Sequence, residues 1–330
     1  MSNILVIGEL LDGQPQPITG ELMRAARSLS LRSGQEVGVV FTVDTMTGID
    51  QGSLNCGADK SYLVEHPLLS CENIEAHVSA LEQVCKEINP SVILAGKTGF
   101  ATDAVPRLAF KLGVGLAQDC VGLDVDDENG NVVATRPVYG GNALARFRFT
   151  DVEPQVCLIR NNVFDSSLSE VEGAWTIQRI DVELDNSLIR TKLVEVVRRQ
   201  STGVKLEDAA IVIGGGRGLG GPEAFDQLNE LAELLGGAVG ASRAVCDAGW
   251  LDHDHQIGLT GKTISPDLYI MIAISGASQH MAGCSGAKNI VAINKDIDAN
   301  IFKEARFGVV GDWEKIFPSF VETTRELINS

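Results

Sequence analysis

Long apolar runs, a leader-like segment and aromatic side chains are missing or scarce in this chain of 330 residues. No apolar run approaches the ~20 residues that span a bilayer. The opening MSNILVIGEL lacks the basic region and long apolar segment of a signal peptide. Aromatic residues make up 5% of the chain, which disfavours surfaces that stack the bases of single-stranded nucleic acid. We therefore expect a soluble, cytoplasmic protein.

Closely spaced cysteines are missing as well. The chain has seven cysteines, widely scattered, and no two of them have CxxC spacing. An odd and scattered set argues against a disulfide framework, an iron–sulfur cluster and a structural zinc site. Reduced thiols in a cytoplasm or a matrix fit this pattern, and no metal is expected.

Positive charge is the third shortage. The formal net charge is −17, and such a field repels phosphate backbones, so nucleic acid is not an expected partner. A small anionic cofactor remains compatible, because backbone amides and a few arginines can bind it locally.

The first half of the chain alternates short apolar runs with amphipathic segments. Such a rhythm predicts a mainly parallel sheet with helices on both faces, which is an α/β fold. The segment 131–181 instead alternates apolar and polar residues, and we expect antiparallel strands appended to the sheet there. Strands are expected at 4–8, 36–43 and 92–96, and helices at 19–33, 74–87 and 101–112.

A second βαβ series follows the polar, charged segment 183–205. The length of the chain and the two series together predict two Rossmann-like domains with parallel sheets. We place a nucleotide-binding-like domain with the appended strands at 1–190, a linker at 191–205 and a second domain at 206–330. Strands of the second domain are expected at 209–214, 238–242, 268–275, 290–294 and 307–310, with helices at 222–235 and at the C-terminus.

A glycine-rich turn, IVIGGGRGLGG, occupies residues 211–221. Consecutive glycines let backbone N–H groups form a concave nest for a phosphate, although a merely flexible turn is the alternative. An ordinary NAD site would place an acidic residue at the end of the next strand. Ser242 and Arg243 stand there instead, which favours a phosphate-bearing ligand in a pose unlike that of ordinary NAD.

The stretch LYIMIAISGASQHMAGC at 268–284 predicts a buried strand, a tight Ser-Gly-Ala turn and a helix that carries His280 in its first turn. No GxSxG elbow occurs in the chain, and no acidic residue is placed to orient His280. A general base and a core residue remain alternatives, but a hydrogen-bond donor to a bound ligand is favoured. A phosphate could then accept from the amides of 276–279.

The segment LDHDHQIGLTGKT at 251–263 contains two histidines and two aspartates. It looks like a solvated loop, and nothing in it supplies the tetrahedral geometry of a metal site. Its glycines surround Thr260, so the loop can bring hydroxyls and backbone amides against a flat ligand.

Asn294 and Asp312 each follow a predicted strand. Open α/β sheets bind ligands at the carboxyl ends of their strands, so both residues could hold a nucleoside. Each of them fits a simple turn or cap residue equally well.

Five segments, GGGRG, VGASR, QIGLTGKT, ISGASQHMAG and INKD, follow one another over residues 214–296. Their order and spacing resemble the electron transfer flavoprotein alpha subunit, whose strongest signature is ISGASQHMAG. PRLAFKLG at 106–113 and YGGNAL at 139–144 extend the resemblance over nearly the whole chain. It implies an FAD-binding, flavodoxin-like C-terminal domain, in a heterodimer whose beta subunit carries AMP or a second FAD.

The resemblance also implies roles for single residues. Arg217 and Ser242 would hold the pyrophosphate region, and Arg243 would lie over the isoalloxazine ring. Thr260 would lie near flavin N5, and His280 would donate toward the pyrimidine carbonyl. The residues expected to bind FAD are Arg217, Ser242, Arg243, Gln256, Ile257, Gly258, Leu259, Thr260, Ser275, Gly276, Ala277, Ser278, Gln279, His280, Asn294, Asp312 and Trp313.

Three of these residues, Asn294, Asp312 and Trp313, would contact the adenosine part of FAD. Two positions depart from the family pattern. Leu259 stands where many members have glutamine, so one hydrogen bond near the flavin is expected to be missing. Cys284 stands where methionine is common, which is a smaller change.

The function implied by the resemblance is electron transport without a catalytic side chain of the protein's own. The complex would shuttle electrons between flavoprotein dehydrogenases, such as acyl-CoA dehydrogenase, and other redox partners in fatty acid or acyl-CoA metabolism. Some family members also bifurcate NADH electrons, and the residues that decide this would largely lie in the beta subunit. The alternatives are an NAD(P)-dependent oxidoreductase and a non-redox nucleotide-binding regulatory module.

Overall fold

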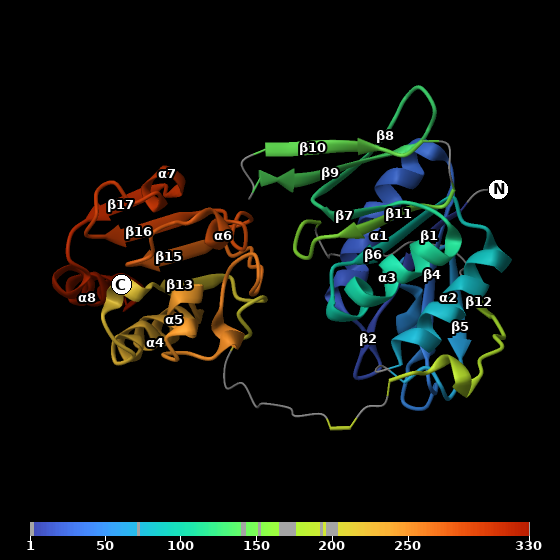
Figure 1. Ribbon diagram of the computed structural model, residues 1–330, viewed down its shortest axis with the longest axis horizontal. Helices are drawn as coiled ribbons and strands as arrows, with labels where there is room; N and C mark the ends of the chain where they lie inside the picture. Colours follow the sequence, from blue (N-terminus) through green and yellow to red (C-terminus); the bar gives the residue numbers. More distant parts are fainter. Residues whose placement is uncertain are drawn as a thin grey trace. The chain divides into compact units, whose positions relative to one another are not determined.

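The computed structural model describes residues 3–70, 73–139, 143–150, 153–164, 176–191, 194–195 and 204–329. The chain divides into two compact units. One comprises Met1–Pro137 and Leu144–Val196, and the other comprises Val138–Ala143 and Val197–Ser330. Each unit is built around its own parallel sheet (Figure 1), as the fold prediction required. The expected linker at 191–205 lies largely outside the described residues.

The first unit contains a seven-stranded sheet in the order β12-β5-β4-β1-β6-β11-β7. Neighbouring strands run parallel, and the central strands are buried on both faces, which explains their nearly continuous apolar sequences. The strands are β1 (Asn3–Ile7), β4 (Glu36–Val43), β5 (Lys60–Glu65), β6 (Val92–Gly96), β7 (Leu116–Cys120), β11 (Gln155–Ile159) and β12 (Thr176–Arg179).

Helices cover both faces of this sheet (Figure 1). Residues of α1 (Pro17–Ser33) pack on one face, and residues of α2 (Ile74–Ile88) and α3 (Gly99–Leu112) pack on the other. α1 ends at Gly34, whose φ of 69° is the left-handed conformation expected of a glycine cap. A small ribbon of β2 (Leu10–Leu11) and β3 (Gln14–Pro15) precedes α1.

The predicted antiparallel strands are only partly confirmed. β8 (Gly122–Val125), β9 (Val132–Val138) and β10 (Ala143–Arg148) do form a separate three-stranded sheet, in which β8 and β9 are antiparallel. The prediction for 155–164 is wrong, because β11 pairs parallel with β6 and β7 inside the main sheet. β12 likewise pairs parallel with β5.

Gln155 explains the error at β11. This polar residue begins the strand and suggests a half-exposed, alternating pattern, yet all five strand residues are buried. Its side chain accepts from the Val132 amide at 2.6 Å and donates to Asn131 Oδ1 at 2.8 Å. A buried amide with its hydrogen bonds satisfied is tolerated in a core, and the sequence alone does not show those partners.

The second unit contains a five-stranded parallel sheet in the order β14-β13-β15-β16-β17. Counted along the chain, this is the order 2-1-3-4-5 of flavodoxin-like folds. The strands are β13 (Ile211–Gly215), β14 (Ala238–Ala241), β15 (Leu268–Ile272), β16 (Ile290–Asn294) and β17 (Phe307–Val310).

Apolar residues pack on both faces of the second sheet. Residues of α4 (Ala224–Leu235), α5 (Arg243–Asp247) and α8 (Trp313–Asn329) pack on one face, and Figure 1 shows α4 and α5 on one side of the sheet. The other face packs against the segment 256–264 and against α7 (Ile301–Glu304). The four-residue helix α6 (Ser278–Met281) follows β15 and carries His280. That location of His280 was predicted from the sequence.

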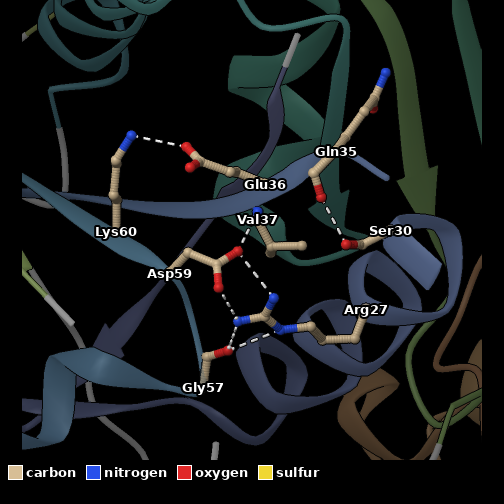
Figure 2. Close-up of polar contacts among 8 residues, drawn as sticks. All are labelled: Arg27, Ser30, Gln35, Glu36, Val37, Gly57, Asp59 and Lys60. Atoms are coloured by element: carbon tan, nitrogen blue, oxygen red, sulfur yellow. Dashed lines mark hydrogen bonds and ion pairs between the residues drawn. The ribbon is translucent and has the colours of Figure 1, made fainter. Parts of the chain in front are cut away.

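The Arg27 guanidinium joins α1 to the turn that precedes β5 in the first unit (Figure 2). Arg27 donates to both carboxylate oxygens of Asp59 at 2.9 Å and to the Gly57 carbonyl at 2.6 and 3.0 Å. Asp59 also accepts from the Val37 amide at 2.7 Å. By contrast, Lys60 and Glu36 form a single, more exposed ion pair at 2.7 Å.

Arg27→Gln should destabilise the first unit more than Lys60→Gln does. We expect a loss of about 1–2 kcal/mol for Arg27→Gln, because several charge-assisted hydrogen bonds in a partly exposed site disappear. Lys60→Gln should cost roughly 0.5 kcal/mol or less, as exposed pairs do. Urea denaturation followed by circular dichroism measures both, and equal losses would contradict the bracing role of Arg27.

Candidate functional site

Five loops meet at one edge of the second sheet because its strands are parallel. We call this the carboxyl edge. It is formed by the loops that follow the five strands. These loops begin at Gly216, Ser242, Ala273, Lys295 and Gly311. The chain order reverses between β13 and β15, and ligands of open α/β sheets bind at such a switch point. Most of the residues predicted to bind FAD lie at this edge.

The loops at the switch point touch through their backbones. A Cβ atom at Gly216 would lie 2.0 Å from the Ala273 carbonyl oxygen, so only glycine fits there. Ala273 has a φ of 55°, a conformation that is unusual for a residue with a side chain, and it ends β15 earlier than the predicted boundary at 275. The Gly216 amide donates to the Ile272 carbonyl at 2.9 Å.

Two predicted arginines are exposed at this edge. The Arg217 guanidinium makes no hydrogen bond or ion pair with any described residue. Arg243 begins α5, and its Nε pairs with Asp247 Oδ2 at 3.2 Å. The Ser242 amide donates to the Gly215 carbonyl at 3.0 Å, which joins the loops after β13 and β14. The edge therefore offers cationic and hydroxyl groups to an anion.

The segment 256–260 is clamped between β14 and α6. The Ile257 amide donates to the Ala241 carbonyl at 2.9 Å, and the Leu259 amide donates to the Gln279 carbonyl at 2.7 Å. The Gln256 side chain donates to Thr260 Oγ1 at 3.0 Å. Leu259 itself is 70% exposed. The fixed backbone therefore presents an apolar side chain to a ligand bound at the carboxyl edge.

The turn 275–279 lies beside α7. Gly276 has a φ of 77°, and a Cβ atom there would lie 2.3 Å from the Ile301 amide nitrogen. That amide donates to the Ser275 carbonyl at 3.1 Å. The turn exposes the side chains of Ser275, Ala277, Ser278 and Gln279. Its backbone is therefore fixed against α7, while these side chains remain accessible to a ligand.

His280 points into the core rather than into solvent. It is 7% exposed, and its Nε2 lies 3.0 Å from the Tyr269 hydroxyl. Nδ1 is buried and makes no hydrogen bond of standard geometry with a described residue. Burial lowers the pKa of His280 to about 4, although the backbone of Ile257 partly opposes that fall. The imidazole is therefore neutral near pH 7.

The residues predicted to contact adenosine have internal roles as well. Asn294 Nδ2 donates to the Ile274 carbonyl at 2.9 Å, which ties β16 to the loop after β15. Asp312 Oδ1 accepts from the Glu314 amide at 3.2 Å at the start of α8. Trp313 is 8% exposed and packs with the core, so only a small part of its side chain remains for a ligand.

The histidines of 251–255 take part in fixing the loop. His253 Nδ1 lies 3.0 Å from Gln256 Oε1, and His255 Nδ1 lies 2.9 Å from the Val239 carbonyl oxygen. Within the described ranges, no group of three or more His, Cys, Asp or Glu side chains could hold a metal ion. Over the same part of the chain, no helix is long and apolar enough to cross a membrane.

Two contacts of the site were not predicted from the sequence. The sequence places Tyr269 in a buried apolar strand, and the structure shows that its hydroxyl is the partner of His280. Gly283 lets the chain after α6 approach the Gly258 backbone, since a Cβ atom at Gly283 would lie 2.4 Å from the Gly258 nitrogen. The one available signal was the single hydroxyl-bearing residue within LYIMI.

Known families match both parts of the chain. Residues 4–185 match the electron transfer flavoprotein domain, and residues 205–285 match the electron transfer flavoprotein FAD-binding domain. The second match contains the segments 256–260 and 275–280, and it identifies FAD as the cofactor.

Curated relatives agree over nearly the full length. The chain is 41% identical to the electron transfer flavoprotein subunit alpha of Thermoanaerobacterium thermosaccharolyticum and to that of Bacillus subtilis, over 98% of each chain. It is 33% identical to subunit LctC of the lactate dehydrogenase (NAD(+),ferredoxin) of Acetobacterium woodii, over 96% of this chain and 76% of the relative. The chain therefore belongs to the electron transfer flavoprotein family, as an FAD-binding alpha subunit that pairs with a beta subunit.

Proposed function

We propose that FAD lies along the carboxyl edge, held by the loops after β13, β14 and β15 and by the segment 256–260. When bound, FAD supplies the electron-transfer chemistry of the complex. The observation that carries the proposal is the meeting of these four segments beside a buried, neutral His280 at the switch point of the sheet. Asn294, Asp312 and Trp313 lie outside these four segments, at the ends of β16 and β17. We propose smaller roles for them at the adenosine end of FAD, because each already contacts the protein.

The groups present at the edge fit such a cofactor. Arg217 suits a pyrophosphate, because guanidinium groups bind phosphates with charge-assisted hydrogen bonds and this one pairs with none of the described residues. The exposed Leu259 and Thr260 suit the face and edge of a flat ring. The buried Nδ1 of His280 has no standard hydrogen bond to the part of the chain that the structure describes, and a ligand acceptor would supply one.

Arg243 and His280 are proposed to set the electron affinity of the bound flavin. Negative charge on a reduced flavin gathers around N1 and the C2 carbonyl, and a guanidinium and an imidazole N–H would both stabilise it there. Because His280 is neutral near pH 7, it acts through a hydrogen bond rather than through a full charge. A preferential stabilisation of about 1.4 kcal/mol raises a one-electron potential by roughly 60 mV.

We further propose that the complex works in the bacterial cytoplasm and exchanges electrons with a flavoprotein dehydrogenase of the acyl-CoA dehydrogenase type. The beta subunit would carry AMP or a second FAD. The similarity to subunit LctC, whose name includes NAD(+) and ferredoxin, favours electron bifurcation with NADH as a second candidate function. An ordinary NAD(P)-dependent oxidoreductase is less well supported, because Ser242 and Arg243 occupy the place of the ribose-binding acid.

Arg217→Gln should weaken FAD binding by the assembled complex about 10- to 100-fold, because a charge-assisted contact worth roughly 1.5–3 kcal/mol is lost. Arg306→Gln is the matched control. Arg306 precedes β17 at the opposite edge of the same sheet and donates to Asn289 Oδ1 at 2.7 Å. Flavin fluorescence titration measures both affinities, and an unchanged value for Arg217→Gln would remove Arg217 from the site.

His280→Ala should lower the midpoint potential of the flavin by roughly 60 mV, since one hydrogen-bond donor to the reduced form is lost. The fold should be retained. His66→Ala, which changes a histidine of the first unit outside the carboxyl edge, should leave the potential unchanged. Spectroelectrochemical titration of the reconstituted complex gives the potentials, and equal values for wild type and His280→Ala would refute the proposed role.

A further inference from the structure

We propose that Tyr269 is a positioning residue that fixes the tautomer of His280, so that Nδ1 carries the proton and Nε2 accepts from the tyrosine hydroxyl. The inference rests on the proposed role of His280 at the flavin. It goes beyond that role because it assigns the donor atom and names the residue that determines it.

The first observation is a hydroxyl buried under α6. Tyr269 in β15 is 0% exposed, and its hydroxyl lies 3.0 Å from His280 Nε2. The two rings stack with an interplanar angle of 29° and a centroid separation of 6.1 Å. Gly214 on β13 leaves room for this hydroxyl, because a Cβ atom there would lie 2.4 Å from it.

The second observation concerns the protons that this pair can share. If His280 Nε2–H donated to the tyrosine oxygen, the tyrosine proton would need another acceptor. The nearby Cys284 thiol instead donates to the His280 and Met281 carbonyls, at 3.6 and 3.7 Å. Leaving a buried donor unpaired costs about 1–3 kcal/mol. Donation from Tyr269 to Nε2 avoids that cost and puts the imidazole proton on Nδ1.

The third observation concerns an acceptor in the backbone of Ile257. The backbone of Ile257 opposes the burial-induced fall in the pKa of His280, as a carbonyl acceptor does and an amide donor does not. Among the described residues, no charged side chain contributes to that pKa. An acceptor beside the ring requires a ring N–H, and with Nε2 accepting from Tyr269 the only ring N–H is that of Nδ1. The acceptor belongs to the segment proposed to run beside the flavin.

A fixed tautomer prepares the site for its ligand. A neutral imidazole with a free choice of tautomer presents either a donor or a lone pair at Nδ1. With Tyr269 donating to Nε2, only the donor remains at Nδ1, and no change of tautomer is needed when an acceptor arrives. The hydroxyl contacts His280 and acts through it, so Tyr269 influences the flavin without touching it.

The test is ¹⁵N nuclear magnetic resonance of the FAD-loaded complex with labelled histidine. Resonances of His280 are assigned by their loss in His280→Gln. In the wild type we expect protonated Nδ1 and unprotonated Nε2, with a scalar coupling from the Tyr269 hydroxyl proton to Nε2. In Tyr269→Phe we expect the Nε2–H tautomer to become populated and the flavin potential to fall by less than in His280→Ala.

Tyr62→Phe is the control, because Tyr62 is a 4% exposed tyrosine of β5 in the first unit. It should change neither the tautomer nor the potential. A protonated Nε2 in the wild type, or an unchanged tautomer in Tyr269→Phe, overturns the inference. If Tyr269→Phe fails to fold, absence of the hydroxyl-to-Nε2 coupling in the wild type still overturns it. A confirmed tautomer with an unaltered potential in His280→Ala would leave the inference standing and defeat the proposed function instead.

Discussion

The close approach of two backbones at the switch point of the second sheet is the constraint on which the site depends. Gly216 and Ala273 meet where no Cβ atom fits at position 216, and Ala273 takes a left-handed conformation to end β15 there. This ending directs the chain through the turn 275–279 into α6. Because α6 follows at once, His280 comes to lie over Tyr269, and the segment 256–260 is pinned against Gln279.

Both sheets have a switch point at their carboxyl edge, but the two switch points differ in what fills them. In the first sheet the order reverses between β1 and β6, and that switch point is occupied by the protein itself. Thr98 donates to Glu9 at 2.6 Å across it, and Ile18 fills the space beside Gly96. Burial raises the pKa of Glu9 to about 7. At the second switch point Arg217, Leu259 and Thr260 are exposed, which leaves that edge available to a ligand.

Periodicity predicted the two parallel sheets and the place of His280, because helices and buried strands leave clear patterns. The order and spacing of ISGASQHMAG and its neighbours predicted the family. Contacts between distant residues could not be predicted in this way. Gln155 looked half-exposed because its partners are remote in the sequence, and Tyr269 looked apolar because nothing nearby in the sequence reveals its hydrogen bond. The sequence positions of Asn294 and Asp312 fitted both ligand contacts and contacts within the protein. Only the folded structure shows the contacts within the protein.

The location of FAD at the carboxyl edge is tested most directly by hydrogen–deuterium exchange of the complex with its beta subunit, compared with and without FAD. Bound FAD should slow amide exchange at 215–219, 256–260 and 274–280, and it should leave 96–99 at the first switch point unchanged. Slowed exchange at 96–99, with no change at 256–260 and 274–280, would contradict the account.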